Sequence, residues 1–299
     1  MKFILDKYYK KTRGFYPFFK YCPDIYKDYY LKKRAFDTMG YEYNWKEPKT
    51  LNEKIRWLIF NEKLDLKTKL TDKILVKSYI AQKIGKNHSA ELYGIYNSFD
   101  EIDFSILPEN IAIKANSGWR MNIFIQDKNI IKTNYNKFKT ITKKWLTTDY
   151  SLFTLEPQYK QIKRKLLIER LRPFDKRINR CDIQVYCFNG EPTLIEIPTN
   201  KEDKTYYQFF DTCWNLQNFT YGINKTTVPL TERPERLDEI FSMCKKLSAE
   251  FSFVRIDFSF DEEDIHVVEM TFTPCGAIIP FKNQTIDFEL GELLDINKI

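Results

Sequence analysis

The chain has 299 residues, of which 43% are hydrophobic and 30% charged, a balance typical of a soluble globular protein rather than a disordered or fibrous one. Its six cysteines include no C-x-x-C pair, and there are only two histidines, which argues against a zinc site. No segment approaches the ~20 consecutive apolar residues that cross a bilayer. We therefore expect a cytoplasmic protein whose thiols are reduced.

The N-terminal segment is the most basic part of the chain. Residues 1–50 carry a net charge of +6, out of +7 for the whole chain, together with 15 of the 48 aromatic residues. Lysines interleaved with aromatic rings suit an anionic membrane surface or nucleic acid. They equally suit a helical extension that packs its rings on the main domain and leaves its lysines in water. We favour the second interpretation and expect no nucleic-acid partner. Peripheral contact of residues 1–47 with the inner face of the membrane is the alternative.

Two helices are predicted first along the chain. Thr50 and Glu53 have the spacing of a capping box, and an apolar stripe at helical spacing follows them. A second helix is expected over residues 71–84, ended by Gly85. One face of this second helix would carry Ile74, Leu75, Ser78 and Ala81.

Beyond residue 90 the pattern changes to short strands joined by hairpins and helices. Strands are expected over 91–96, 110–114, 121–127, 165–171, 182–188 and 191–198, and helices over 132–146 and 234–251. Asn189-Gly190 predicts a two-residue hairpin turn, and residues 253–260 and 265–273 predict a further hairpin. Hairpins mixed with helices indicate an α+β fold rather than a regular alternation of parallel strands.

The last hairpin brings acidic residues together. Because strand side chains alternate, Arg255 and Asp257 share one face, as do Glu269 and Thr271 on the second strand. A turn near residues 262–263 would set Asp257 opposite Glu269, where the two carboxylates repel. Magnesium, which is held by one or two carboxylates and substrate phosphates, would relieve that repulsion. An amphipathic hairpin in which Arg255 neutralises one acid fits the spacing equally well. The other face of the second strand would carry Val268, Met270 and Phe272.

A second pattern lies at residues 111–122. Lys114 ends an apolar strand and runs into the small polar loop Asn116-Ser117-Gly118. Such a loop can place an ammonium group beside phosphates, with backbone N–H groups cradling them. Surface strands also often end in lysine, so this pattern alone leaves an ordinary loop open.

Several motifs taken together resemble the TupA-like ATP-grasp family, which is named for a teichuronopeptide-biosynthesis protein. They are PKTLNEKIRWL (48–58), LTDK (70–73), SFDEIDF (98–104), CFNG (187–190), FVRID (253–257) and EMTFTP (269–274). The resemblance implies an α+β ATP-grasp fold, in which two subdomains clamp ATP. It would occupy residues 48–299, after a helical extension at 1–47, with a smaller lid-type subdomain at about 110–170.

The resemblance also implies an activity. ATP-grasp ligases use ATP and Mg²⁺ to convert a carboxylate into an acyl phosphate, which an amine then attacks to give an amide. Family members are associated with capsule, teichuronic-acid or lipopolysaccharide biosynthesis, so the expected partners are a uronic acid and an amine or amino acid. The alternatives are a catalytically lapsed nucleotide-binding module and, from the label that many relatives carry, a glycosyltransferase. No clear D-x-D motif supports the last of these.

The resemblance assigns nucleotide-binding roles to particular residues. Lys73 and Lys114 correspond to the two lysines that contact phosphates, with Lys114 also acting in catalysis. Glu169 corresponds to the hinge acid beside the adenine. Further nucleotide contacts are expected from Asn116, Ser117, Asp182 and Gln184.

Metal and catalytic roles follow in the same way. Asp257 and Glu269 correspond to the magnesium carboxylates, and Thr271 stands where many ATP-grasp enzymes have an asparagine ligand. Arg255 is expected to steady the acyl phosphate or the substrate carboxylate.

The sequence departs from the family at its phosphate loop. The family pattern K-x-N-H-G-S-G-G-N appears here as residues 114–122, with Ser117 in place of histidine and with Arg120 and Met121 in place of glycines. We expect strain at Trp119 and Met121 wherever the loop needs a positive φ. A catalytic guanidinium at Arg120 would replace the lost backbone donors. Likewise D-Y-K-F appears as residues 182–185, with Gln184 replacing the lysine.

Overall fold

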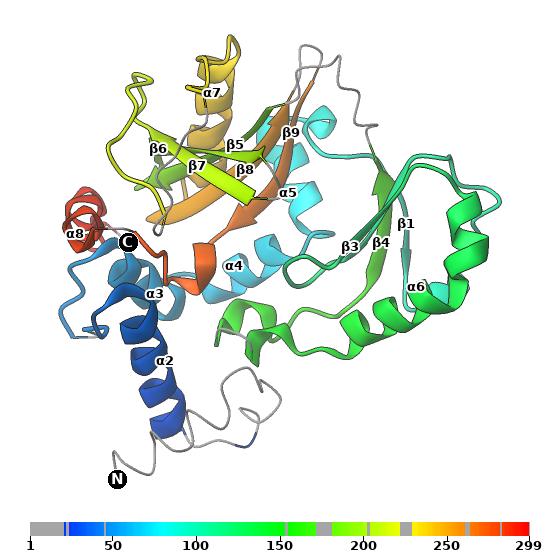
Figure 1. The fold of residues 1–299 in the computed structure, drawn as a ribbon, viewed down its shortest axis with the longest axis horizontal. Coiled ribbons are helices and arrows are strands. Elements are labelled where there is room, and N and C mark those ends of the chain that lie inside the picture. The colour runs from blue at the N-terminus through cyan, green and yellow to red at the C-terminus, as the bar shows by residue number, and fades with distance from the viewer. Residues whose placement is uncertain are drawn as a thin grey trace.

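The fold consists of two antiparallel sheets with helices between and around them (Figure 1). The computed structural model describes residues 21, 24–44, 46–152, 155–171, 181–201, 204–221, 229–260, 264–281 and 283–298. The first twenty residues of the basic extension, and most of the acidic turn at 261–264, lie outside these ranges. Membrane contact by the extension therefore stays a prediction. In the described part of the chain, no helix combines the length and apolarity needed to cross a membrane.

The larger sheet has five strands in the order β7-β6-β5-β8-β9. Its strands are β5 (Cys181–Phe188), β6 (Glu191–Lys201), β7 (Lys204–Phe210), β8 (Phe253–Phe260) and β9 (Ile265–Thr271). The predicted turn between β5 and β6 is confirmed, with positive φ angles of 50° at Asn189 and 84° at Gly190. Strand β7 was missed by the sequence analysis.

The smaller sheet has four strands in the order β1-β4-β2-β3. Its strands are β1 (Leu92–Tyr96), β2 (Ile111–Ala115), β3 (Asn122–Ile125) and β4 (Leu166–Arg170). Helix α6 (Asn129–Thr147) packs on this sheet through Ile131 and Phe138. Because β1 pairs with β4, we place the start of this smaller unit at Leu92, ahead of the expected residue 110.

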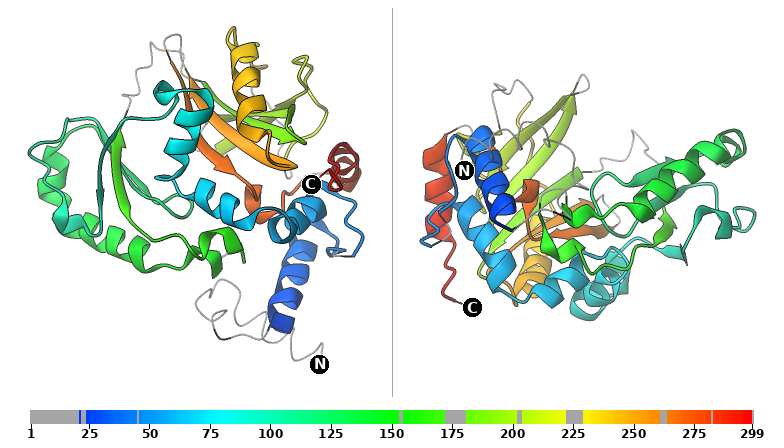
Figure 2. Two further views of the ribbon diagram at one scale, coloured as in Figure 1. Left: turned by 180° about the vertical axis from the view of Figure 1, so that it is seen from behind. Right: turned by 90° about the horizontal axis from the view of Figure 1, so that it is seen from below.

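The remaining helices surround the larger sheet and fill the space between the two sheets. They are α2 (Asp24–Met39), α3 (Leu51–Asn61), α4 (Leu64–Thr71), α5 (Val76–Ile84), α7 (Leu237–Ser248) and α8 (Gln284–Leu293). Short 3₁₀ turns occur at Lys86–His88, Phe99–Glu101, Tyr150–Leu152, Pro157–Tyr159 and Pro274–Gly276. Helices α5 and α7 bury their apolar residues against one face of the larger sheet. Figures 1 and 2 show α4 and α5 between the two sheets, and α8 beside α3.

The expected helix over residues 71–84 is wrong in its start, and the face that was expected to carry Ile74, Leu75, Ser78 and Ala81 is not the buried one. Helix α4 ends at Thr71 and α5 begins only at Val76, because Asp72 leaves the helix and its carboxylate accepts the backbone N–H of Ile74 at 2.8 Å. The buried residues of α5 are Val76, Tyr79 and Ile80, whereas Leu75 and Ser78 are exposed. Lys73 and Lys77, which follow the break, both lie at the space between the two sheets.

The last hairpin also differs from the expected alternation. Asp257 lies opposite Glu269, as predicted, but Phe258 lies opposite Val267, so Val268 is an extra residue in a bulge. Val268 is consequently 49% exposed, and the expectation that it shares the buried face of Met270 is wrong.

The motif at residues 48–58 connects α3 to the C-terminal part of the chain. The predicted capping box between Thr50 and Glu53 is confirmed at the start of α3. The Asn52 side chain donates to Ile279 O at 3.1 Å and to Asp287 at 2.7 Å, and its own oxygen accepts the N–H of Ile279 at 2.7 Å. These bonds fix α8 and the segment after β9 against α3.

Gly291 of α8 lies against the backbone at the start of α3. A Cβ atom at this position would overlap the carbonyl oxygen of Lys49 and lie 2.8 Å from the carbonyl carbon of Thr50. We predict that Gly291→Ala lowers the free energy of unfolding by about 1–3 kcal/mol, the usual cost of overpacking. Urea denaturation measures this. Glu292→Ala, at an exposed position of the same helix, is the control, and equal stability of the two variants would contradict the prediction.

Candidate active site

A cleft of ≈ 480 Å³ lies between the two sheets. Strands β2, β3 and β4 line one side, β5, β8 and β9 line the other, and the start of α5 lies between them. Its charged lining consists of Lys73, Lys77, Lys114, Glu169, Arg170 and Asp182. Cationic side chains outnumber carboxylates in this lining, so the cleft favours an anion such as a polyphosphate.

The carboxylate of Glu169, on β4, forms ion pairs with two lysines of the cleft. Lys114 of β2 pairs with one oxygen of its carboxylate, and Lys77 of α5 pairs with the other at 3.0 Å. Burial alone would raise the pKa of Glu169, but Lys114 and Lys77 hold it below its ordinary value. The carboxylate is therefore ionised and keeps two ammonium groups side by side in the cleft.

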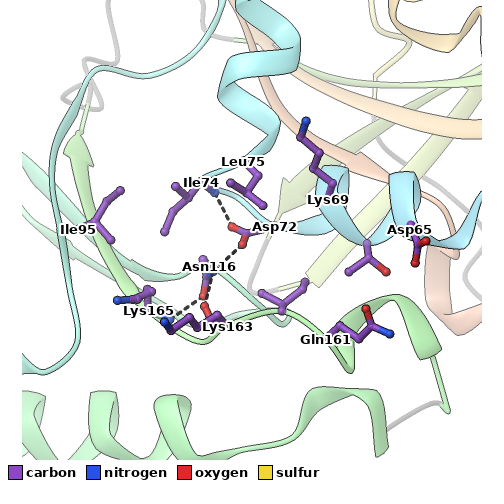
Figure 3. Close-up of a pocket in the computed structure, with 12 residues that line it drawn as sticks. Asp65, Lys69, Asp72, Ile74, Leu75, Ile95, Asn116, Gln161, Lys163 and Lys165 are labelled. Atoms are coloured by element: carbon purple, nitrogen blue, oxygen red, sulfur yellow. Dashed lines mark hydrogen bonds between the residues drawn. The ribbon is translucent and has the colours of Figure 1, made fainter.

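Residues 114–122, which stand where the family has its phosphate loop, are here called the phosphate-type loop. This loop is held in place through Asn116. Its amide donates to Asp72 at 2.9 Å and to Lys163 O at 3.1 Å, and its oxygen accepts the N–H of Lys165 at 2.8 Å. Figure 3 shows these bonds in the wall of a second pocket of ≈ 550 Å³, beside α4. The Asn116 side chain thus makes its hydrogen bonds to protein atoms, and these bonds fix the position of the loop. The expected contact of this side chain with nucleotide stays a prediction.

Lys73 links the same loop to the larger sheet. Its backbone N–H donates to Asn116 O at 3.0 Å, and its Nζ donates to Gly118 O at 3.0 Å. The same Nζ lies 3.9 Å from the carboxylate of Glu269. The Lys73 ammonium group therefore lies between the loop and the expected metal carboxylates.

The loop places its backbone strain at a different residue from the one expected. Positive φ angles occur at Gly118 (104°) and Arg120 (56°), and not at Trp119 or Met121, so the expectation of strain at those two residues is wrong. Arg120 occupies a left-handed conformation that costs a non-glycine residue roughly 1–2 kcal/mol. Its guanidinium stacks on the Trp119 ring, 4.3 Å from the centroid, at the exposed tip of the loop.

Asp257 and Glu269 form the acidic centre of the hairpin. They are register partners on β8 and β9, and Arg255 binds both oxygens of Asp257 at 2.8 Å. Burial raises the pKa of Asp257 to about 7; Arg255 opposes this increase, whereas Glu269 adds to it. Ionisation of Asp257 next to Glu269 is thus unfavourable even though Arg255 contacts Asp257. Arg255 therefore pairs with one acid, as the second interpretation expects, while the two carboxylates still oppose each other across the strands. Magnesium binding by this pair stays a prediction.

The donor atoms around this pair fit a magnesium ion. The hydroxyl oxygen of Thr271 and the amide oxygen of Gln184 are buried and have no hydrogen-bond partner within the described chain. Gln184 is the register partner of Asp257 on β5, and Thr271 is that of Arg255 on β9, so these oxygens share one face of the sheet with both carboxylates. Two carboxylates with neutral oxygens suit Mg²⁺. No group of three His, Cys, Asp or Glu side chains with metal-binding geometry occurs among the described residues.

The other expected residues lie around this centre. Asp182 lines the cleft from β5, opposite Ser259, and Ser117 is buried in the loop. Sequence analysis missed Lys77, although its spacing of four residues from Lys73 was a usable signal. It also missed Glu156, because no motif marks the irregular segment that carries it.

Glu156 lies in a buried polar cluster beyond Glu269. Its carboxylate accepts a hydrogen bond from the Thr273 hydroxyl, and the Gln158 amide donates to Thr273 at 2.7 Å. Burial raises the pKa of Glu156 to about 7, an effect opposed by Thr273 and Arg56. The folded protein therefore binds a proton at Glu156 that the unfolded chain releases between pH 4.5 and 7.

This shift predicts a pH dependence of stability. The contribution of Glu156 to the free energy of unfolding is greatest below pH 4.5 and falls as the pH rises to about 7. Glu156→Gln does not titrate, so it should gain up to about 3 kcal/mol relative to wild type between pH 4.5 and 8. Urea denaturation at several pH values measures the difference. The exposed Glu191→Gln variant is the control, and parallel profiles for wild type and Glu156→Gln would contradict the prediction.

The family of the chain follows from its sequence rather than from solved structures. D-alanine–D-alanine ligase from Bacillus anthracis with ATP is 14% identical, with a TM-score of 0.41 over 68% of this chain and 55% of that one. The enzyme from Helicobacter pylori is 14% identical, with a TM-score of 0.41 over 82% and 69%. The ATP-grasp ligase PsnB with a minimal precursor is 8% identical, with a TM-score of 0.41 over 69% and 54%.

This chain spans only about half the length of PsnB and of the Bacillus anthracis ligase. No curated protein matches the sequence. The family model for TupA-like ATP-grasp proteins matches residues 53–295. That span is most of the chain, which therefore belongs to the TupA-like ATP-grasp family.

Proposed function

We propose that this protein is an ATP- and Mg²⁺-dependent ligase that joins a carboxylate to an amine through an acyl phosphate. The observation that carries the proposal is the placement of Lys73, with its ammonium group between the phosphate-type loop and Glu269. A cationic cleft, an acidic pair and an arginine then adjoin one another, as phosphoryl transfer to a carboxylate requires.

The cleft would hold the nucleotide. Lys73, Lys77 and Lys114 supply positive charge for phosphates, at the place where charge develops during transfer. Glu169 holds Lys77 and Lys114 in the cleft, and nucleotide phosphates would compete with it for these lysines. Asn116 holds the loop against Asp72, which fixes the position of the loop next to Lys73.

The acidic centre would hold the metal and the acid to be activated. Asp257, Glu269 and Thr271 would bind Mg²⁺, which would neutralise charge on the phosphates. Arg255 has the charge and planar donors that suit a carboxylate or acyl phosphate beside that metal. In the reaction, a carboxylate oxygen bonds to the γ-phosphorus and ADP leaves. The amine nitrogen then bonds to the acyl carbon as phosphate leaves, and the amine gives up a proton.

The substrate class is carried by the family resemblance alone. We propose a uronic acid of a surface polysaccharide, such as capsule or lipopolysaccharide, as the acid. The glycosyltransferase alternative has no feature in its favour, because the acidic residues of the site lie on paired strands beside lysines that suit ATP. The strained, substituted loop at Arg120 is the one feature that favours a lapsed module.

Release of ADP tests the proposal. Purified full-length protein with ATP and Mg²⁺ should release ADP when supplied with the correct pair from a panel of uronic acids and amines. Lys114→Ala should lower this turnover by about 10²-fold or more, because it removes a preorganised charge beside the transferred phosphoryl group. Lys139→Ala on the outer helix α6 should retain the activity and serves as the control. Tight ATP binding with no ADP from any pair would favour the lapsed module, and undiminished turnover by Lys114→Ala would refute the assigned site.

A further inference from the structure

The second pocket, of ≈ 550 Å³ beside α4, takes no part in the proposed reaction. The link between α4 and α5 lines it from one unit of the fold. Strand β1 and the segment before β4 line it from the unit of the smaller sheet. Figure 3 shows Ile74 and Leu75 of the link on one side of the pocket, with Gln161 and Lys163 on the other. A cavity of this volume accommodates a small organic molecule.

Part of the lining is aliphatic. Leu75 and Ile95 are each 45% exposed, and Ile74 and Ile162 line the pocket with them. The two exposed side chains come from different elements but border one cavity. A ligand with an apolar body would remove both from water, which is favourable.

The charged part of the lining is predominantly basic. It consists of Lys69, Lys163 and Lys165 against the carboxylates of Asp65 and Asp72. Both oxygens of Asp72 already accept hydrogen bonds from the protein. The lysines therefore determine the charge that a ligand meets, and they favour an anion.

Two of these lysines are unpaired. The Lys165 ammonium group donates to Asn97. Those of Lys69 and Lys163 have no hydrogen-bond or ion-pair partner within the described chain. A phosphate group, which lysine binds as a point charge, suits such a lining.

The pocket and the nucleotide cleft lie across the same boundary of the fold. Along the link, Asp72 and Leu75 line the pocket, whereas Lys73 and Lys77 line the cleft. The bond from Asn116 to Asp72 joins the smaller sheet to the link in the wall of the pocket. A molecule that bridges the pocket therefore holds together the two units that also form the cleft.

We propose that this pocket binds a phosphate monoester of an apolar molecule, and that binding there strengthens nucleotide binding in the cleft. The phosphate group is bound by the lysines of the lining, and the apolar body packs on Leu75 and Ile95. Each ligand favours the arrangement in which the two units are held together, so each strengthens the binding of the other. The pocket is thus an effector site, separate from the proposed reaction.

Matched probes test whether the pocket binds this class of ligand. Thermal unfolding of the full-length protein is followed with saturating Mg²⁺ and a non-hydrolysable ATP analogue, which fills the cleft. The probes are hexyl phosphate, hexanol and inorganic phosphate, with phenyl phosphate and phenol as a second pair. An ester should raise the Tm where its alcohol and inorganic phosphate do not, since ligands that bind only the native state stabilise it. Esters that act like inorganic phosphate would refute the site.

Variants assign the effect to the pocket. Lys163→Ala should weaken ester binding by about 10-fold, because a charged partner is lost. Leu75→Ser should weaken it as well, because the apolar body loses its contact. Lys160→Ala is the matched control, since Lys160 is exposed on the same segment but does not line the pocket. Ester binding that is unchanged in both pocket variants would overturn the assignment.

The affinity for the nucleotide analogue tests the coupling. Isothermal titration with and without hexyl phosphate should show tightening by about 5-fold or more, and Lys163→Ala should reduce this effect at the same ester concentration. An ester that binds through Lys163 but leaves the analogue's affinity unchanged would refute the effector role. If the analogue does not bind at all, the ligase proposal and the coupling both fail. Ester binding without the analogue that is lost in Lys163→Ala would then still support the pocket.

Discussion

The opposition of Asp257 and Glu269 across β8 and β9 is the constraint on which the rest of the site depends. Antiparallel pairing places the two carboxylates on one face, and the bulge at Val268 keeps them opposite each other while Val267 is buried. Arg255 offsets only part of the resulting repulsion, and the pKa of Asp257 is still raised to about 7. Glu269 has the Lys73 ammonium group 3.9 Å away, and the buried oxygens of Thr271 and Gln184, which have no partner within the described chain, support the proposed metal site beside the pair.

Much of the rest of the molecule serves to hold three segments near that pair. The capping box at Thr50 and the Asn52 bonds fix the chain after β9, where Thr273 lies. Asp72 follows the end of α4, accepts the N–H of Ile74 and binds Asn116, so one carboxylate helps to position Lys73, Lys77 and the phosphate-type loop. Several residues that resemble family motifs are thus architectural, and they contribute to function by position.

The sequence predicted local features better than tertiary ones. The capping box, the Asn189-Gly190 turn and the pairing of Asp257 with Glu269 depend on neighbours in the chain, and the structure has all three. The break at Asp72, the bulge at Val268 and the positive φ at Arg120 have no marker in the local sequence pattern, and they were missed or misplaced. Glu156 could not have been found from the sequence, because only the burial of its irregular segment beside Thr273 raises its pKa.

The central claim is that Asp257 and Glu269 together bind the cation that accompanies the nucleotide. Electron paramagnetic resonance of Mn²⁺ with a non-hydrolysable ATP analogue measures this directly, without knowledge of the acid or the amine. The account predicts a protein-bound Mn²⁺ signal that requires the nucleotide in wild type and is lost in the Asp257→Asn, Glu269→Gln double variant. An equal bound signal in the double variant, with the fold intact by circular dichroism, would contradict it.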